Sequence, residues 1–203
     1  MFSTSRQSST SLAAMPTTRT ISAFNTATAS ENKIHDDAVA SRFGFTGGLV
    51  PGVDVFAYLA HMPMARWGKD WLTGGSMQAR FGKPVYDGDT ASVTATPEAD
   101  GSLSLSISAR GIACASGTAK AKGAEPPADL LGAAEMPAHE SRPPASQASL
   151  APGLTLGTLR EVYTRDDGLA HIDAVRDDAA LYDDGRIANA AWLLRRANYV
   201  LAE

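Results

Sequence analysis

The sequence has little of several things that mark particular classes of protein. It holds one cysteine among 203 residues, so neither a disulfide framework nor a cysteine-built metal site is expected. Charged residues make up 20% and the formal net charge is −4, which argues against a nucleic-acid-binding surface. The most apolar stretch, 49–65, is interrupted by Asp54 and His61 and falls short of the roughly 18 apolar residues of a membrane span. We therefore expect a globular, cytoplasmic protein.

The N-terminal segment predicts no packed structure. Fourteen of the first 30 residues are Ser or Thr, and Arg6 and Arg19 are the charged residues there. That composition is typical of a transit peptide and also of a disordered start, and both interpretations stay open. We assign residues 1–20 to a disordered N-terminus.

A second break in composition divides the rest of the chain. Five of the 11 prolines fall within residues 122–149, among alanine, serine and glutamate. Such a stretch is typical of a linker. It separates a first unit of residues 21–121 from a shorter second unit of residues 150–203.

The first unit changes its hydrophobic period from helical to alternating. After a short strand at 21–28, Asp36 or Asp37 is expected to cap a short helix that ends at Gly44. Pro51 is expected to open a longer helix at its first position, and Pro63 to break or restart it. Period-two alternation then predicts four strands, at 75–83, 89–96, 103–108 and 111–120. This order predicts an α+β fold with a helix on one face of an antiparallel sheet.

Two segments carry the candidate catalytic groups: the loop before the short helix and the glycine-rich segment between the two helices. His35 lies in a predicted loop, where an imidazole can act as a general acid or base. The glycine-rich segment 44–52 leads into the long helix, whose first backbone N–H groups can bind a developing oxyanion. The alternative is that His35 only caps or packs the loop.

These residues together resemble the MaoC-like, (R)-specific enoyl-CoA hydratase-type hot-dog family. Its motif reads Asp-x-Asn-Pro-x-His, followed by an Asp, a Gly-Phe and a helix entered through His-Gly. The downstream segment 81–89 is similar to the Pro-Val-x-x-Gly-Asp strand and turn of the family. The matching positions of the first motif are Asn32, Ile34, His35, Asp37, Gly44, Phe45 and Gly52.

The resemblance covers about residues 21–121 and implies a hot-dog fold, in which an antiparallel sheet wraps a long helix. It implies acyl-thioester substrates, on coenzyme A or an acyl carrier protein, and reversible hydration of a trans-2-enoyl group, with no cofactor and no metal. His35 and Asn32 are then the catalytic residues, and Gly48, Val50, Pro51 and Gly52 line the substrate site. The partners it implies are a second copy of the chain or another hot-dog subunit.

Three departures from the motif bear on activity. Ser30 stands where the family has its catalytic aspartate, five residues before the histidine. Lys33 replaces the usual proline, and Pro51 replaces the second histidine. The sequence therefore leaves two possibilities: an active hydratase-type enzyme that takes its carboxylate from elsewhere, or a non-catalytic acyl-binding or scaffolding half that serves a partner subunit.

The second unit resembles an incomplete second hot-dog that ends in a helix at 187–201. One register places Asp177 at the position of the family's acid and Tyr182 at that of its histidine. A competing register uses Asp166 and His171. We expect the helix to dock near the first unit, and an acid of 165–184 either to reach His35 or to face solvent.

The remaining polar and reactive residues have simpler interpretations. Cys114 is expected in the core of a strand. His61 and His139 show no partner pattern. The seven aspartates of 166–184 lack the spacing of a cation-binding loop, which favours a solvated face.

Overall fold

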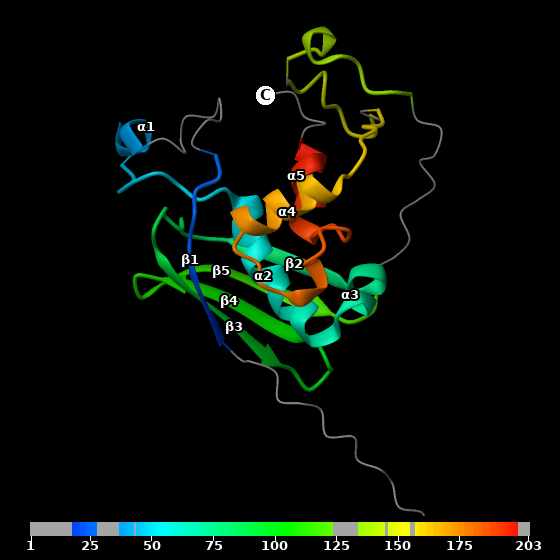
Figure 1. Ribbon diagram of the computed structural model, residues 1–203. Coiled ribbons are helices and arrows are strands. Elements are labelled where there is room, and N and C mark those ends of the chain that lie inside the picture. Colours follow the sequence, from blue (N-terminus) through cyan, green and yellow to red (C-terminus); the bar gives the residue numbers. More distant parts are fainter. Residues whose placement is uncertain are drawn as a thin grey trace, which may run out of the picture.

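The computed structural model describes residues 18–27, 37–42, 44–123, 134–144, 146–154 and 157–198. Figure 1 shows three layers: an antiparallel sheet, a long central helix across it, and a C-terminal group of short helices on the far side of that helix. The central helix is therefore covered on one side by the sheet and on the other by C-terminal helices that are distant from it in sequence.

The sheet has five strands in the order β1-β3-β4-β5-β2, and all neighbours are antiparallel. This confirms the expected α+β architecture, and the four strands predicted from alternation are all present. The strands are β1 (Thr18–Ser22), β2 (Ser76–Phe81), β3 (Thr90–Pro97), β4 (Leu103–Ala109) and β5 (Ile112–Lys120).

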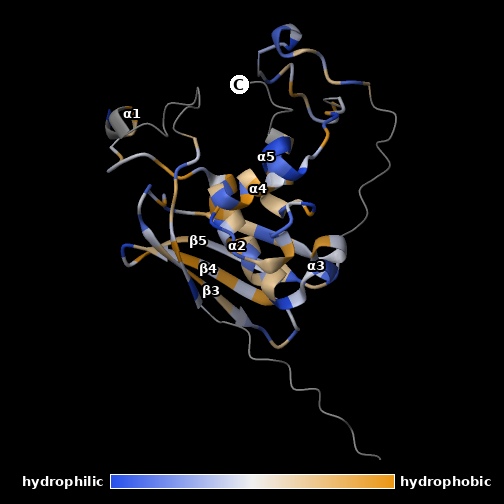
Figure 2. Ribbon diagram, viewed as in Figure 1, coloured by the Kyte–Doolittle hydropathy of each residue, from blue (hydrophilic) through white to orange (hydrophobic). Residues whose placement is uncertain are grey.

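Alternation along β4 explains why one face of the sheet is buried. Leu103, Leu105 and Ile107 are at most 1% exposed, while the serines between them face outward. Successive side chains of a strand point to opposite faces, so the leucines and the isoleucine share the face that meets the helix. Cys114 lies in the same core, as expected. Along the strands beneath the central helix, Figure 2 accordingly shows orange, hydrophobic stretches between pale and blue ones.

The central helix α2 (Gly52–Trp67) is longer than Pro63 led us to expect. The helix begins at Gly52, one residue later than predicted, and Pro51 is its N-cap rather than its first residue. Pro63 lies inside the helix and does not break it, although proline removes one backbone hydrogen bond. The helix is buried along its middle, from Ala57 to Met64, and this packing offsets the lost bond.

Two short helices flank α2. The helix α1 (Asp37–Arg42) was expected from the capping pattern, and Gly44 follows it with a left-handed φ of 84°. After α2, Gly68 starts the one-turn helix α3 (Lys69–Gly74), whose Trp71 is buried.

The C-terminal part contains the helix α4 (Arg165–Ala174), the 3-10 turn η3 (Ala180–Tyr182) and the helix α5 (Ala190–Asn198), and the linker holds the 3-10 turn η2 (His139–Ser141). A capping box between Thr164 and Asp167 starts α4. The helix α5 begins three residues later than expected, because Asn189 caps it by accepting a hydrogen bond of 2.8 Å from the Ala191 amide.

The C-terminal helices dock on α2, as the sequence predicted. Ala191 and Val175 pack on Ala57, and Tyr182 packs in a second cluster with Met64. Trp192 is 8% exposed and meets the ring of Tyr163 edge-on at 4.8 Å. Leu193, in contrast, is 59% exposed.

Two sequence expectations about the termini of these units differ from the structure. The strand β1 begins at Thr18, inside the segment assigned to a disordered N-terminus, and ends at Ser22 rather than continuing to 28. Pairing with β3 places it, from Thr18 opposite Thr94 to Ser22 opposite Thr90. Near the start of the second unit, Thr158 makes an isolated bridge with Glu135.

Candidate functional site

The start of α2 is an accessible helix N-terminus. The first N–H groups of an α-helix have no partner within the helix, and the helix dipole makes this end positive. Gly52, the first residue, is exposed. The Asp54 amide, in contrast, donates a hydrogen bond of 2.9 Å to the Pro51 carbonyl. The N–H group of the exposed Gly52 therefore stands at the position where an α-helix has donors without an intrahelical acceptor.

The four predicted substrate-site residues have different roles in the structure. The Val50 amide donates to the Val85 carbonyl at 2.9 Å, so this N–H is engaged within the protein. Gly48 is buried and its carbonyl accepts a hydrogen bond from the Asp87 amide. Pro51 has no N–H and caps the helix. Gly52 alone among the four combines an exposed position with a backbone donor at the helix start.

The segment that leads into the motif is held against the first two turns of α2. The Phe24 amide donates to the Tyr58 hydroxyl at 3.1 Å, and the Thr26 hydroxyl donates to the Asp54 carboxylate at 2.5 Å. Tyr58 and Asp54 are fully buried, and burial raises the pKa of the Tyr58 hydroxyl. Phe24 and Thr26, which precede the motif, therefore lie beside the first two turns of the helix.

The two predicted catalytic residues, His35 and Asn32, lie outside the described residues, as does Ser30. Their assignment stays a prediction. The structure describes the chain up to Ala27 and again from Asp37, on either side of the motif.

An aromatic side chain lies near the accessible helix start. Phe81, the last residue of β2, is 52% exposed. A Cβ atom added at Gly52 would lie 3.9 Å from two carbons of its ring, an ordinary van der Waals contact. The helix donors therefore have an exposed apolar surface beside them.

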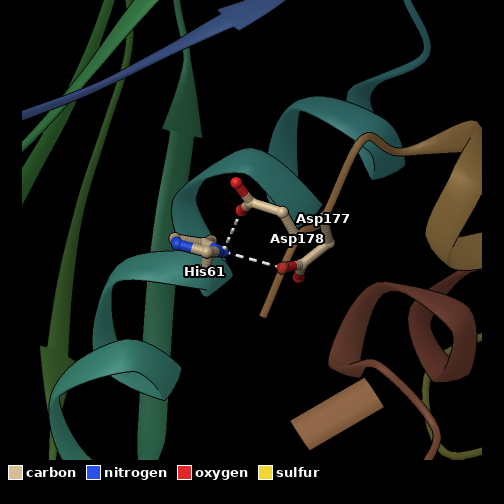
Figure 3. Close-up of side chains that lie close together, drawn as sticks. All are labelled: His61, Asp177 and Asp178. Atoms are coloured by element: carbon tan, nitrogen blue, oxygen red, sulfur yellow. Dashed lines mark hydrogen bonds and ion pairs between the residues drawn. The ribbon is translucent and has the colours of Figure 1, made fainter. Parts of the chain in front are cut away.

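A second polar cluster joins α2 to the C-terminal part, and it was not predicted from the sequence. His61 lies on α2, and a hydrogen bond of 2.7 Å joins its Nδ1 to Asp177 Oδ1 (Figure 3). Both residues are buried, so the expectation that the aspartates form a solvated face is wrong for Asp177. Asp178 Oδ1 lies 3.9 Å from the same nitrogen.

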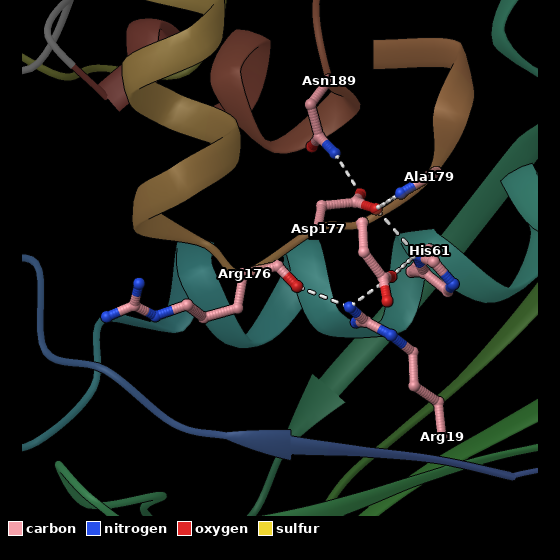
Figure 4. A network of polar contacts seen from close by, with 7 residues as sticks. Arg19, His61, Arg176, Asp177, Ala179 and Asn189 are labelled. Atoms are coloured by element: carbon pink, nitrogen blue, oxygen red, sulfur yellow. Dashed lines mark hydrogen bonds and ion pairs between the residues drawn. The ribbon is translucent and has the colours of Figure 1, made fainter. Parts of the chain in front are cut away.

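The carboxylate of Asp177 is satisfied by three groups (Figure 4). Besides His61, the Asn189 side chain donates to Oδ2 at 3.0 Å and the Ala179 amide donates to Oδ1 at 3.1 Å. Buried carboxylates need such partners because desolvation is costly. Both oxygens of Asp177 are thus engaged at the third turn of α2.

His61, Asp177 and Asp178 offer three potential metal-ligand atoms that lie within 4.8 Å of one another. No metal was expected at these residues from the sequence. Arg19, reaching up from β1, binds Asp178 at 2.7 Å and so brings a positive charge to the cluster (Figure 4). Ion pairing and hydrogen bonding account for this arrangement, and we assign it to the docking of the C-terminal part.

The arrangement of helix and sheet now decides the fold. A long helix lies across one face of an antiparallel sheet whose strands run in the order β1-β3-β4-β5-β2. The chain has a hot-dog fold. No protein-family model matches the chain, and no curated protein matches it.

Three solved structures that resemble this hot-dog chain are the following. A chain of the ChsH1–ChsH2 complex from Mycobacterium tuberculosis is 18% identical with a TM-score of 0.39, over 52% of this chain and 91% of the other. The (R)-hydratase from A. caviae involved in PHA biosynthesis is 24% identical with a TM-score of 0.37, over 55% and 96%. A MaoC domain protein from Chloroflexus aurantiacus J-10-fl is 12% identical with a TM-score of 0.37, over 93% and 66%.

The described helices of the hot-dog chain include none that combines the length and the hydrophobicity needed to cross a bilayer.

The structure describes the residues of both registers that were proposed for the second unit. Asp166 is exposed on α4 while His171 is buried, and residues five apart on a helix do not share a face. In the other register, Tyr182 is 1% exposed and burial raises the pKa of its hydroxyl. Neither pair forms an acid–histidine dyad.

His171 is buried, and its side chain is uncharged at neutral pH. Burial lowers its pKa from 6.5 to about 4, and the positive charge of Arg195 acts in the same direction. Its Nε2 atom is buried and makes no hydrogen bond within the described structure. A histidine in this position is structural, and it makes the packing of α4 sensitive to acid.

Proposed function

We propose that this hot-dog chain binds acyl thioesters, carried by coenzyme A or an acyl carrier protein, and hydrates trans-2-enoyl groups reversibly. The observation that carries the proposal is that the segment leading into the His35 motif is held, through Thr26 and Asp54, against the helix start that offers the Gly52 N–H. The resemblance of the motif to MaoC-like hydratases supplies the chemistry.

The proposed reaction uses the Gly52 N–H at the helix start and the His35 imidazole of the motif. The N–H of Gly52 binds the thioester oxygen and stabilises the negative charge that develops there. His35 takes a proton from water as its oxygen adds to C3 of the enoyl group. The proton then passes to C2, so that one water is consumed and a 3-hydroxyacyl thioester forms. Asn32 orients the water or His35, and Phe81 offers apolar surface to the acyl chain.

A second candidate function rests on Ser30. A serine cannot act as the carboxylate that the family places five residues before the histidine. The chain would then be a non-catalytic acyl-binding or scaffolding half that works with a second copy or another hot-dog subunit. The two candidates share acyl-thioester binding and differ in turnover.

The first experiment separates these two functions. Purified protein is incubated with crotonyl-CoA and the formation of 3-hydroxybutyryl-CoA is followed by chromatography, while binding of saturated butyryl-CoA is measured by calorimetry. Turnover that His35→Ala removes supports the hydratase. The matched control is His139→Ala, because His139 is an exposed histidine in the linker. Binding without turnover favours the binding half, and neither binding nor turnover refutes both.

A gain-of-function variant tests the departure at position 30 directly. Ser30→Asp restores the residue type of the family at that position. If the lost carboxylate limits the reaction, the variant hydrates crotonyl-CoA about 100-fold faster than the native chain, the lower end of the range of acid–base contributions. An unchanged rate would mean that the native chain takes its carboxylate from elsewhere or that the site does not hydrate enoyl groups.

A further inference from the structure

A fully buried acid lies in the first turn of the central helix. Asp54 is 0% exposed and follows Gly52 by two residues. Its Oδ2 accepts the hydrogen bond from Thr26, and its Oδ1 forms an ion pair with Nη2 of Arg195. An ionised carboxylate in such a place needs a compensating charge, because desolvation strongly disfavours it.

The compensating charge comes from the other end of the chain. Arg195 lies on α5, 141 residues after Asp54. The same Nη2 atom also donates to the Thr26 hydroxyl at 2.9 Å. One guanidinium therefore bridges the helix start to the segment that leads into the motif.

The bridge lies at the place where the proposed site needs precision. A hydratase requires its histidine and its oxyanion donors at fixed separation, and a displacement of about 1 Å can reduce a rate about 100-fold. Thr26 belongs to the segment before the motif, and Asp54 belongs to the turn that presents Gly52. Arg195 contacts both, so α5 fixes these two parts relative to each other.

We propose that Arg195 is a positioning residue of the acyl-thioester site, through which the C-terminal helix takes part in the function of the hot-dog unit. This inference rests on the proposed function. Arg195 acts through Asp54 and Thr26 and does not itself touch the substrate.

The neighbouring arginine provides a matched control. Arg196 lies on the same helix and has a similar exposure, with 29% of its side chain accessible against 28% for Arg195. It pairs with Glu161 and stacks over the Trp192 ring at 4.8 Å, away from the helix start. Arg196→Met therefore reports what the loss of one arginine of α5 does to docking alone.

The experiment compares four variants of the full-length chain: Arg195→Met, Arg195→Lys, Arg196→Met and the double variant Asp54→Asn/Arg195→Met. Stability is measured by urea unfolding, exchange of the amides of 23–27 and 52–55 by hydrogen–deuterium exchange, and kcat and KM on crotonyl-CoA. Lysine keeps the charge but lacks the planar fork of arginine, so it is expected to rescue only in part. The double variant removes the buried charge together with its partner.

We expect Arg195→Met to lower kcat about 100-fold and to accelerate amide exchange in both segments, whereas Arg196→Met changes neither. The double variant is expected to recover the unfolding midpoint but not kcat, because the bridge is still missing. Recovery of kcat together with stability would show that Arg195 is only structural and overturn the inference. Equal kcat in Arg195→Met and Arg196→Met would overturn it as well.

The failure of the proposed function has a different signature. A native chain that neither binds butyryl-CoA nor hydrates crotonyl-CoA refutes the proposed function, and the role of Arg195 in it, before any variant is compared. A native chain that is active while Arg195→Met keeps its kcat refutes the role of Arg195 alone.

Discussion

The imidazole of His61 and the carboxylate of Asp177 lie 2.7 Å apart although 116 residues separate them in sequence. The contact joins the middle of the hot-dog helix to the turn after α4. Both residues are buried, so neither has water to replace the other as a partner. The pair therefore ties the C-terminal part to the hot-dog unit.

Removing the acid of this pair should destabilise the protein. Asp177→Ala leaves His61, the Asn189 amide and the Ala179 amide without their shared acceptor. We expect the free energy of unfolding, measured in urea, to fall by about 3 kcal/mol, the lower range for breaking a buried pair. The control is Asp183→Ala, at an exposed aspartate nearby, which should change it by less than about 0.5 kcal/mol. An equal, small loss in both variants would contradict the role of the pair.

The stability of the protein should fall between pH 6.5 and pH 4. His171 has a pKa of about 4 in the folded state and an ordinary value of 6.5 when unfolded, so the unfolded state binds the proton first as the pH drops. Above pH 6.5 the neutral His171 leaves the free energy of unfolding at its full value. Between pH 6.5 and pH 4 that free energy falls by about 3 kcal/mol in total.

Unfolding in urea at a series of pH values measures this loss. His171→Gln should flatten the curve of stability against pH between 6.5 and 4.5. His139→Gln, at an exposed histidine, should leave the slope of the native protein. A slope that survives in His171→Gln would assign the acid sensitivity to other groups.

A single methyl group should disturb the edge of the sheet. Gly117 on β5 pairs with Ala79 on β2, and a Cβ atom there would lie 2.6 Å from the Gln78 carbonyl oxygen. Because that atom belongs to the backbone, β2 must shift, and Gly117→Ala should cost about 1–3 kcal/mol of stability. Gly74→Ala is the matched control: no heavy atom lies within 4 Å of the added carbon, and alanine favours the helix. Thermal unfolding of both variants makes the comparison.

The proposed oxyanion donor can be removed without disturbing the helix. Gly52 is the first residue of α2, where proline is well tolerated, and the ψ of 140° at Pro51 suits a following proline. Gly52→Pro should keep the stability but lower turnover of crotonyl-CoA about 100-fold, as loss of one oxyanion donor does. Gly52→Ala keeps the N–H and meets Phe81 only at van der Waals distance, so it should stay active. Equal activity in the two variants would remove the N–H from the mechanism.

The sheet could be predicted from sequence because its signal is local. Leu103, Leu105 and Ile107 alternate with serines, and Gly88 and Gly101 mark turns with positive φ, so the limits of β2 to β5 came within two residues of those observed. The strand β1 has no such alternation, and its observed range of 18–22 differs by three and six residues from the expected 21–28. The limits of the helix α2 were harder to predict. Pro63 is a local signal for a break, and burial of the surrounding residues overrode it.

The polar contacts of the site could not be predicted in the same way. Nothing beside Asp177 or Asp54 in the sequence identifies its partner, because His61 and Arg195 lie 116 and 141 residues away. No periodicity connects such positions. Docking of the C-terminal helix was predictable from its apolar residues, while the ion pairs that accompany it depend on how that helix is oriented on α2.

The distance in sequence between α2 and its outer cover has a consequence for synthesis on the ribosome. The strands that complete the hot-dog sheet are made soon after α2, but Asp177 follows His61 by 116 residues. At about 5–20 residues per second, that interval lasts roughly 6–23 s. Throughout it, the nascent hot-dog unit exposes the side of its helix that carries Ala57, His61 and Met64. A chaperone that binds nascent chains has its best opportunity on this protein during that interval, and on that side of α2.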